Sequence, residues 1–222
     1  MPMDASAERT VPTGSLAEPG LVGARLLHAA VYAVPFLWLI GHLFPPINHD
    51  AAAVLDFSRR WLQGETLYAD LIDINTPLTF LHYCVPVLLS DLTGLATPTT
   101  LVLWFAIVMA GSGLLCHRII AHVVPAEFEI SRTLLLAFIL FGFSIVPGDE
   151  FGQREHLMVM LAMPYVLAAA ARARGIAMER RLHVLCAALA VAGFAMKPHF
   201  AAMPALIELY VLHAREIGRA HV

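Results

Sequence analysis

Seven runs of apolar residues, separated by polar segments, dominate the pattern of this chain. They cover about residues 26–43, 77–90, 99–116, 133–147, 157–171, 182–196 and 200–212. A helix that crosses a bilayer needs roughly 17–25 mostly apolar residues. The first and third runs have this length unaided, and the later runs reach it when their small or weakly polar flanks are included. The pattern therefore predicts an all-α fold, a polytopic bundle of membrane-spanning helices.

The composition supports a membrane protein and excludes several other classes. Of the 222 residues, 59% are hydrophobic and 14% are charged, with a mean hydropathy of +0.73. Soluble domains average about 45–50% apolar and about 25% charged residues. The net charge of -3 gives no basic surface for nucleic acid, so nucleic acid is not an expected partner. The three cysteines lie inside apolar runs, where they form neither a disulfide framework nor a zinc-binding pattern.

The two ends of the chain differ in character from the rest. Residues 1–24 are small, polar and rich in proline and glycine, which predicts a disordered cytoplasmic tail before an uncleaved signal anchor. Residues 217–222 resemble a translated sequencing adapter and are expected to be non-native. Residues 25–216 would then be the N-terminal part of a longer transmembrane domain.

The run at 77–90 decides the topology of the first loop. It is short for a spanning helix and contains His82, Cys84 and Pro86, which favours an interfacial segment. If the run does not cross and the N-terminus is cytoplasmic, nine basic residues lie on the cytoplasmic side of the membrane and four on the outer side. If the run crosses and the N-terminus is outside, the counts are the same. The positive-inside rule therefore orients every loop after residue 95 and leaves the first loop open. On segment length we expect about six spans, a cytoplasmic N-terminus and a periplasmic loop at 44–98.

This periplasmic loop is amphipathic. Residues 51–64 predict a short helix with Asp50 as its N-cap, lying on the membrane surface through Val54, Leu55, Phe57, Trp61 and Leu62. The acidic residues also gather on the proposed outer side. They are Asp50, Asp56, Glu65, Asp70, Asp73, Asp91, Asp149, Glu150 and Glu155.

The polar stretches of the outer side follow a characteristic order. An acid after the first span precedes a Gly-x-x-Leu-Tyr-x-Asp segment (64–70), an Asn-Thr-Pro-Leu approach to the next helix (75–78), a second acidic loop (149–156) and a lysine after the fifth span. With this order, residues 25–215 resemble the N-terminal half of bacterial GT-C-type integral membrane glycosyltransferases. That group includes protein mannosyltransferases and the lipid A aminoarabinose transferase.

The resemblance implies an activity, partners and site residues. Such enzymes move a sugar from a polyprenyl-phosphate donor to an acceptor at the periplasmic face of the bacterial inner membrane. Asp50 then matches the catalytic acid, Asp149 or Glu150 the acid of the second loop, and Lys197 a contact to the donor phosphate. Two departures stand out: Ala51 replaces a second acid, and Asp149-Glu150 replaces an Asp-x-Asp pair. The second departure weakens the case for a divalent cation, which would use Asp50 and Asp149.

The chemistry independently favours these residue types. A carboxylate can act as general base for a sugar hydroxyl, and fixed cations stabilise the charge that grows on a leaving phosphate. Lys197, the only lysine, and Arg154 are therefore expected to hold the donor phosphate. The remaining candidates for substrate binding are Glu155, His156, His199, Tyr68 and Asp73.

Structural roles compete with these assignments. Asp50 can serve only as an N-cap, Lys197 can snorkel to the interface, and Glu208 can be a bundle-facing acid paired with a neighbour. Two other functions also compete with the enzyme, namely a transporter or flippase for a lipid-linked anion and a non-catalytic assembly subunit. The sequence leaves the sugar and the acceptor open.

Overall fold

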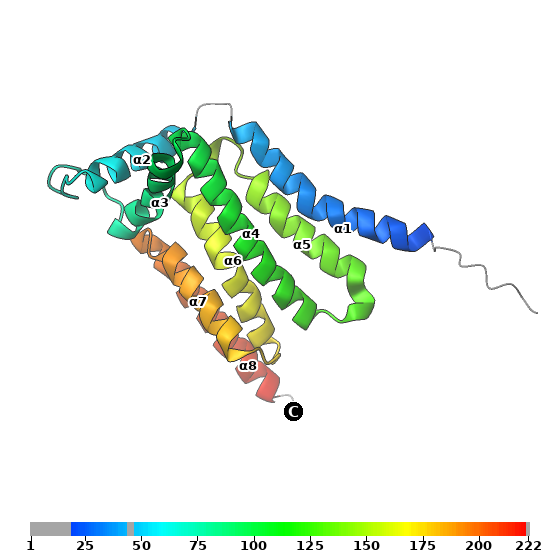
Figure 1. Ribbon diagram of the computed structural model, residues 1–222. Helices are drawn as coiled ribbons and strands as arrows, with labels where there is room; N and C mark the ends of the chain where they lie inside the picture. The colour runs from blue at the N-terminus through cyan, green and yellow to red at the C-terminus, as the bar shows by residue number, and fades with distance from the viewer. Residues whose placement is uncertain (1–18, 44–46, 221–222) are drawn as a thin grey trace, which may run out of the picture.

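The computed structural model describes residues 19–43 and 47–220 (Figure 1). Over these residues the chain is helical and contains no β-strand, which confirms the all-α prediction. The described residues form eight α-helices, which are α1 (Pro19–Trp38), α2 (His49–Leu62), α3 (Pro77–Thr93), α4 (Thr97–Val123), α5 (Glu129–Ser144), α6 (Arg154–Ala173), α7 (Arg180–Phe194) and α8 (Ala202–Ala220). Short 3-10 helices are η1 (Leu39–Leu43), η2 (Ala126–Phe128), η3 (Gly148–Glu150) and η4 (Pro198–Ala201).

The long helices form a bundle around α4 and α6. Helix α6 packs against α4, α7 and α8, while α1 and α5 lie beside each other on the other side of α4. Helices α2 and α3 lie across one end of the bundle (Figure 1). We call this end, with the turns 145–153 and 195–201, the loop end. The opposite end, with the turns 124–128 and 174–179, is the arginine end.

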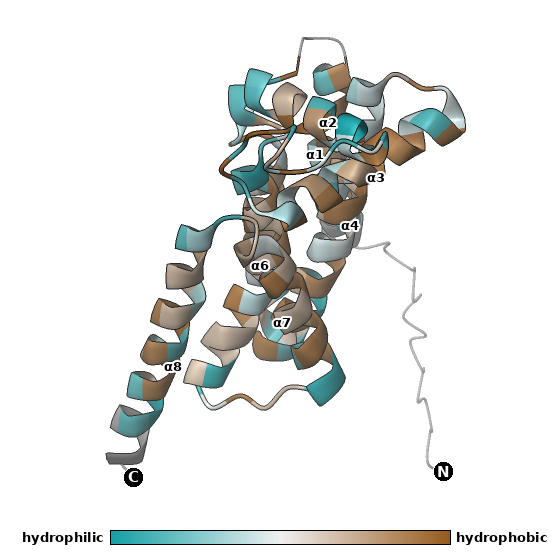
Figure 2. Ribbon diagram, turned by 90° about the vertical axis from the view of Figure 1, so that its left-hand side faces the viewer, coloured by the Kyte–Doolittle hydropathy of each residue, from teal (hydrophilic) through white to brown (hydrophobic). Residues whose placement is uncertain are grey.

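The sides of the bundle expose apolar residues to the surroundings. On α4 these include Leu103, Ile107 and Leu114, and Phe138 on α5 is 80% exposed. Figure 2 shows brown apolar segments along the helices and teal polar segments at the loop end, at the arginine end and along α8. Soluble monomers rarely expose apolar surface on this scale, so the arrangement fits a membrane protein.

Three helices of the described chain are long and apolar enough to cross a membrane. They are Arg25–Leu43, Thr97–Val123 and Arg154–Ala173. The other three predicted spans do not reach this standard, because α5 has 16 residues, α7 has 15, and α8 carries Glu208, Arg215 and Glu216. Length and composition therefore support three of the six predicted spans.

The structure corrects one predicted boundary. Helix α1 begins at Pro19, so residues 19–24 are helical rather than part of a disordered tail. The rest of the predicted tail, residues 1–18, lies outside the described residues. The backbone of 217–220 continues α8, and the suggestion that 217–222 are non-native stays a prediction.

Helix α2 packs differently from the prediction. Val54 and Leu55, predicted to lie on the membrane surface, are 2% and 5% exposed and belong to the protein core. Ser58 is fully buried and its hydroxyl donates to the Phe80 carbonyl of α3 at 3.1 Å. The apolar face of α2 covers α3, because α3 supplies a second apolar surface at the same end of the bundle.

Glu208, the acid within the last apolar run, is paired with side chains of a neighbouring helix. The Glu208 carboxylate of α8 accepts hydrogen bonds from Arg172, at 3.1 Å from one guanidinium nitrogen, and from the Tyr165 hydroxyl. Both partners lie on α6. The interpretation of Glu208 as a bundle-facing, paired acid is confirmed.

Candidate functional site

The start of α2 delivers Asp50 to the loop end. The N-cap of this helix is Asn48 rather than the predicted Asp50, and the Asn48 side-chain oxygen accepts from the Asp50 backbone N–H at 2.9 Å. The Asn48 amide also donates to the Asp149 carbonyl at 3.0 Å, which ties α2 to the turn before α6. Because Asn48 takes the capping role, the Asp50 carboxylate is available for other partners.

The turn before α6 is built tightly. Gly152 has a φ of +89°, and its carbonyl accepts a hydrogen bond from the buried Tyr83 hydroxyl. Burial raises the pKa of Tyr83. His156 is buried, with its Nε2 at 2.6 Å from the Phe143 carbonyl and its ring against Phe151. His156 therefore fixes this turn from within.

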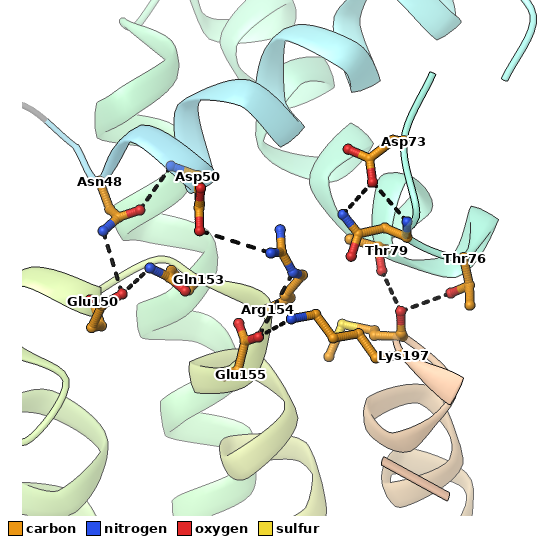
Figure 3. Close-up of polar contacts among 12 residues, drawn as sticks. Asn48, Asp50, Asp73, Thr76, Thr79, Glu150, Gln153, Arg154, Glu155 and Lys197 are labelled. Carbon is orange, nitrogen blue, oxygen red and sulfur yellow. Dashed lines mark hydrogen bonds and ion pairs between the residues drawn. The ribbon is translucent and has the colours of Figure 1, made fainter. Parts of the chain in front are cut away.

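Four charged side chains form a continuous row at the loop end (Figure 3). Asp50 Oδ2 lies 3.9 Å from an Arg154 guanidinium nitrogen, and Arg154 Nε lies 3.9 Å from Glu155 Oε1. The Lys197 ammonium then donates to Glu155 Oε1. We call this row the ion-pair chain. It joins α2, α6 and the turn after α7, which are far apart in the sequence.

Lys197 is held in place by its neighbours. Thr76 and Thr79, at the start of α3, both donate to the Met196 carbonyl, at 3.0 and 2.8 Å. The Lys197 side chain is only 16% exposed and lies over the Phe200 ring at 5.8 Å. It therefore points toward Glu155.

The two acids of the second loop have different surroundings. Glu150 accepts hydrogen bonds from Gln153 and from Asn48, the latter at 3.5 Å. Asp149 is exposed and contributes its backbone carbonyl to Asn48. Glu150 thus lies beside the ion-pair chain through Asn48, whereas Asp149 faces a neighbouring cavity.

Three predicted substrate contacts lie outside the ion-pair chain. The Tyr68 hydroxyl donates to the Asn75 carbonyl at 2.6 Å, and Asp73 accepts from the Asn75 backbone N–H at 2.7 Å. Both side chains therefore stabilise the loop between α2 and α3 in which they lie. Partial burial, reinforced by the Asp73 charge, raises the pKa of Tyr68. His199 is exposed and packs against Phe200.

The structure adds residues that the sequence did not single out. Asn48 and Gln153 donate to Glu150 beside the ion-pair chain. Thr76 and Thr79 hold the Met196 carbonyl next to Lys197. Asn48 carried a usable signal, because asparagine is among the preferred N-caps. The threonine contacts depend on how α3 meets the turn after α7, which no local pattern encodes.

Space for a ligand lies on both sides of η3. A cavity of about 540 Å³ is lined by Asn48 and Asp149, and one of about 470 Å³ is lined by Glu150, Gln153 and Glu155. Buried Glu155 Oε2 and Arg154 Nε have no hydrogen-bond partner. Of these two residues, Glu155 lines the cavity of about 470 Å³, whereas Arg154 is not among the described lining of either cavity.

The described side chains form no preorganised metal site of three or more ligands. Within residues 19–43 and 47–220 no group of three or more His, Cys, Asp or Glu side chains is placed to hold a metal ion. The charged partner of Asp50 on α6 is the cation Arg154.

Gly152 offers a test of the turn that positions the ion-pair chain. A Cβ at this residue would lie 3.1 Å from Leu101 Cδ2, on a backbone with φ of +89°. We expect Gly152→Ala to destabilise the protein by about 1–3 kcal/mol, measured as a lower apparent melting temperature in detergent. Gly142→Ala in α5 is the matched control, because a Cβ there meets nothing within 4 Å. Equal melting temperatures for the two variants would contradict the role of Gly152.

Comparisons with protein families, curated proteins and solved structures found no match to this chain.

Proposed function

We propose that this protein is a membrane glycosyltransferase that moves a sugar from a polyprenyl-phosphate donor to an acceptor at the periplasmic face of the bacterial inner membrane. One observation carries the proposal. The ion-pair chain joins the carboxylate expected to act as base, Asp50, with the two cations expected to hold phosphate, Arg154 and Lys197. The resemblance of residues 25–215 to GT-C-type enzymes supports the same activity.

The reaction follows from these groups. Asp50 accepts the proton of the acceptor hydroxyl while the hydroxyl oxygen bonds to the anomeric carbon of the donor sugar. The bond from that carbon to the phosphate oxygen breaks, polyprenyl phosphate leaves, and the configuration inverts. Arg154 and Lys197 stabilise the charge on the leaving phosphate in a water-poor site. Glu155 holds Lys197 in the free protein, so an incoming phosphate competes with Glu155 for the ammonium group.

Six spans and a periplasmic loop end belong to this proposal. Helices α5 and α7 measure about 24 and 22 Å at 1.5 Å per residue, shorter than the roughly 30 Å hydrocarbon core. They cross the bilayer together with the residues that flank them. The arginine end then faces the cytoplasm, as the positive-inside rule requires. Its basic residues include Arg118, Arg132, Arg172, Arg174, Arg180, Arg181 and Arg215.

Cysteine labelling tests this orientation. The native cysteines, Cys84, Cys116 and Cys186, are buried, so an added cysteine reports its own position. Ile74 of the loop end is 94% exposed, and Ala177 of the arginine end is exposed. In intact spheroplasts we expect a membrane-impermeant maleimide to label Ile74→Cys. Ala177→Cys should react only after permeabilisation, and the reverse pattern would overturn the orientation.

A donor-cleavage assay tests the activity itself. Membranes containing the protein are supplied with a radiolabelled polyprenyl-phosphate sugar, and the release of polyprenyl phosphate is measured against membranes without the protein. A transferase releases it, whereas a flippase moves the intact donor between leaflets. An assembly subunit does neither. Transport of an intact donor would replace the proposed function with the transporter alternative.

A further inference from the structure

The cavity lined by Asn48 and Asp149 beside η3 combines aromatic and polar side chains. It has a volume of about 540 Å³ and lies where the end of α1, η1, the start of α2 and η3 meet. This volume is within the range of about 300–1,000 Å³ typical of small-molecule sites. Its described lining is Trp38, Gly41, His42, Ile47, Asn48, Gly148, Asp149 and Phe151.

Aromatic rings form one wall of this cavity. The His42 ring stacks on Phe151 with 4.1 Å between centroids and 15° between planes. Trp38 contributes a large ring that is 50% exposed. A flat, partly exposed ring of this kind offers a surface for an apolar ligand face.

Polar groups without partners lie around the same space. His42 Nε2 is buried and has no hydrogen-bond partner, which is costly unless a ligand or water supplies one. Asp149 exposes its carboxylate at the cavity. The described lining includes no lysine or arginine, so the cavity does not suit a phosphate.

We infer that this cavity binds a sugar ring, and the inference rests on the proposed function. A sugar has an apolar C–H face that can pack on Trp38 and hydroxyl groups that can bond to Asp149 and His42. The cavity also lies next to the start of α2, because Asn48 lines it and accepts from the Asp50 backbone N–H at 2.9 Å. The ring can belong to the acceptor or to the donor, and the experiment distinguishes these sources.

Tryptophan fluorescence of the purified protein tests the inference without turnover. The variant Trp61→Phe/Trp104→Phe keeps Trp38 as the only indole, and Trp38→Phe/Trp104→Phe keeps Trp61 of α2 as the control. Each is titrated in detergent with mannose, N-acetylglucosamine and arabinose. We expect at least one sugar to change Trp38 emission saturably and leave Trp61 emission unchanged.

A second substitution makes the response specific. Asp149→Ala in the Trp38 variant should weaken the apparent affinity about tenfold, the effect of losing one hydrogen bond to a charged group. Unchanged Trp38 emission with every sugar, an equal response of Trp61, or an unaltered affinity in Asp149→Ala would each overturn the inference. A response that reflects only membrane-interface placement of Trp38 would not depend on Asp149.

Two further probes identify the source of the ring. If the donor sugar binds, the polyprenyl-phosphate sugar changes Trp38 emission and polyprenyl phosphate alone does not. If the acceptor sugar binds, free sugar still changes the emission when the donor is present. A Trp38 response without donor cleavage would retain the sugar site and refute the transferase, whereas cleavage without a Trp38 response would refute only the sugar site.

Discussion

Replacing Asp50 with asparagine is expected to lower the rate of sugar transfer by about 10²–10⁴-fold, the usual contribution of a general base. Asparagine has nearly the same size, so the start of α2 and its Asn48 cap stay in place. Donor binding should change little, because Arg154 and Lys197 remain. The measurement is kcat in the donor-cleavage assay, together with the affinity for a labelled donor.

Asp56→Asn is the matched control for this prediction. Asp56 lies on the same helix, is exposed, and its carboxylate is 3.9 Å from an Arg60 nitrogen. We expect Asp56→Asn to retain wild-type kcat. A kcat of Asp50→Asn equal to that of Asp56→Asn would remove Asp50 from the catalytic role. Loss of donor binding in Asp50→Asn with unchanged kcat would assign it to binding instead.

Much of the helical architecture could be predicted from the sequence, because burial in a bilayer leaves long apolar runs. The run at 99–116 became the 27-residue helix α4, and the run at 26–43 became α1 with η1. The short run at 77–90 became a 17-residue helix across the loop end. The ends of α5 and α7 were less predictable. The apolar runs at 133–147 and 182–196 continue past the last residues of these helices, Ser144 and Phe194, into the turns that follow.

The packing of α2 shows what the pattern could not provide. An amphipathic helix has an apolar face, but this face can cover lipid or protein equally well. Val54 and Leu55 pack within the protein because α3 lies against them. The capping residue was also misassigned by two positions, since both Asn48 and Asp50 are suitable caps.

The candidate site was predictable only in part, for a geometric reason. The order of spans places Asp50, Arg154, Glu155 and Lys197 at one end of the bundle, and this much followed from the sequence. Their contacts depend on the packing of α6 against α7 and on the threonines of α3. The loop around Asn75, in contrast, could have been predicted from the sequence. An aspartate commonly accepts a hydrogen bond from the backbone N–H two residues later, as Asp73 does from Asn75.

The contact between Lys197 and Glu155 yields the second large expected effect, on stability. Lys197→Met removes the cationic partner of the Glu155 carboxylate. The Lys197 side chain is 16% exposed and the Glu155 side chain is 41% exposed. Because the pair is partly rather than fully buried, we expect a loss of about 1–3 kcal/mol, in the range of hydrogen bonds to charged groups. The apparent melting temperature in detergent should fall accordingly.

A double-mutant cycle separates the pair from its surroundings. In Lys197→Met/Glu155→Gln the stranded charge is gone, so the double variant should be more stable than the sum of the single changes predicts, with a coupling of about 0.5–3 kcal/mol. The exposed pair Arg59 and Asp91, with a 2.8 Å contact, is the matched comparison and should couple by only about 0.2–1 kcal/mol. Additive effects of Lys197 and Glu155 would mean that the ammonium does not depend on Glu155. Lys197 would then be free to bind phosphate without competition, and Glu155→Gln should leave the affinity for a labelled donor unchanged rather than raise it.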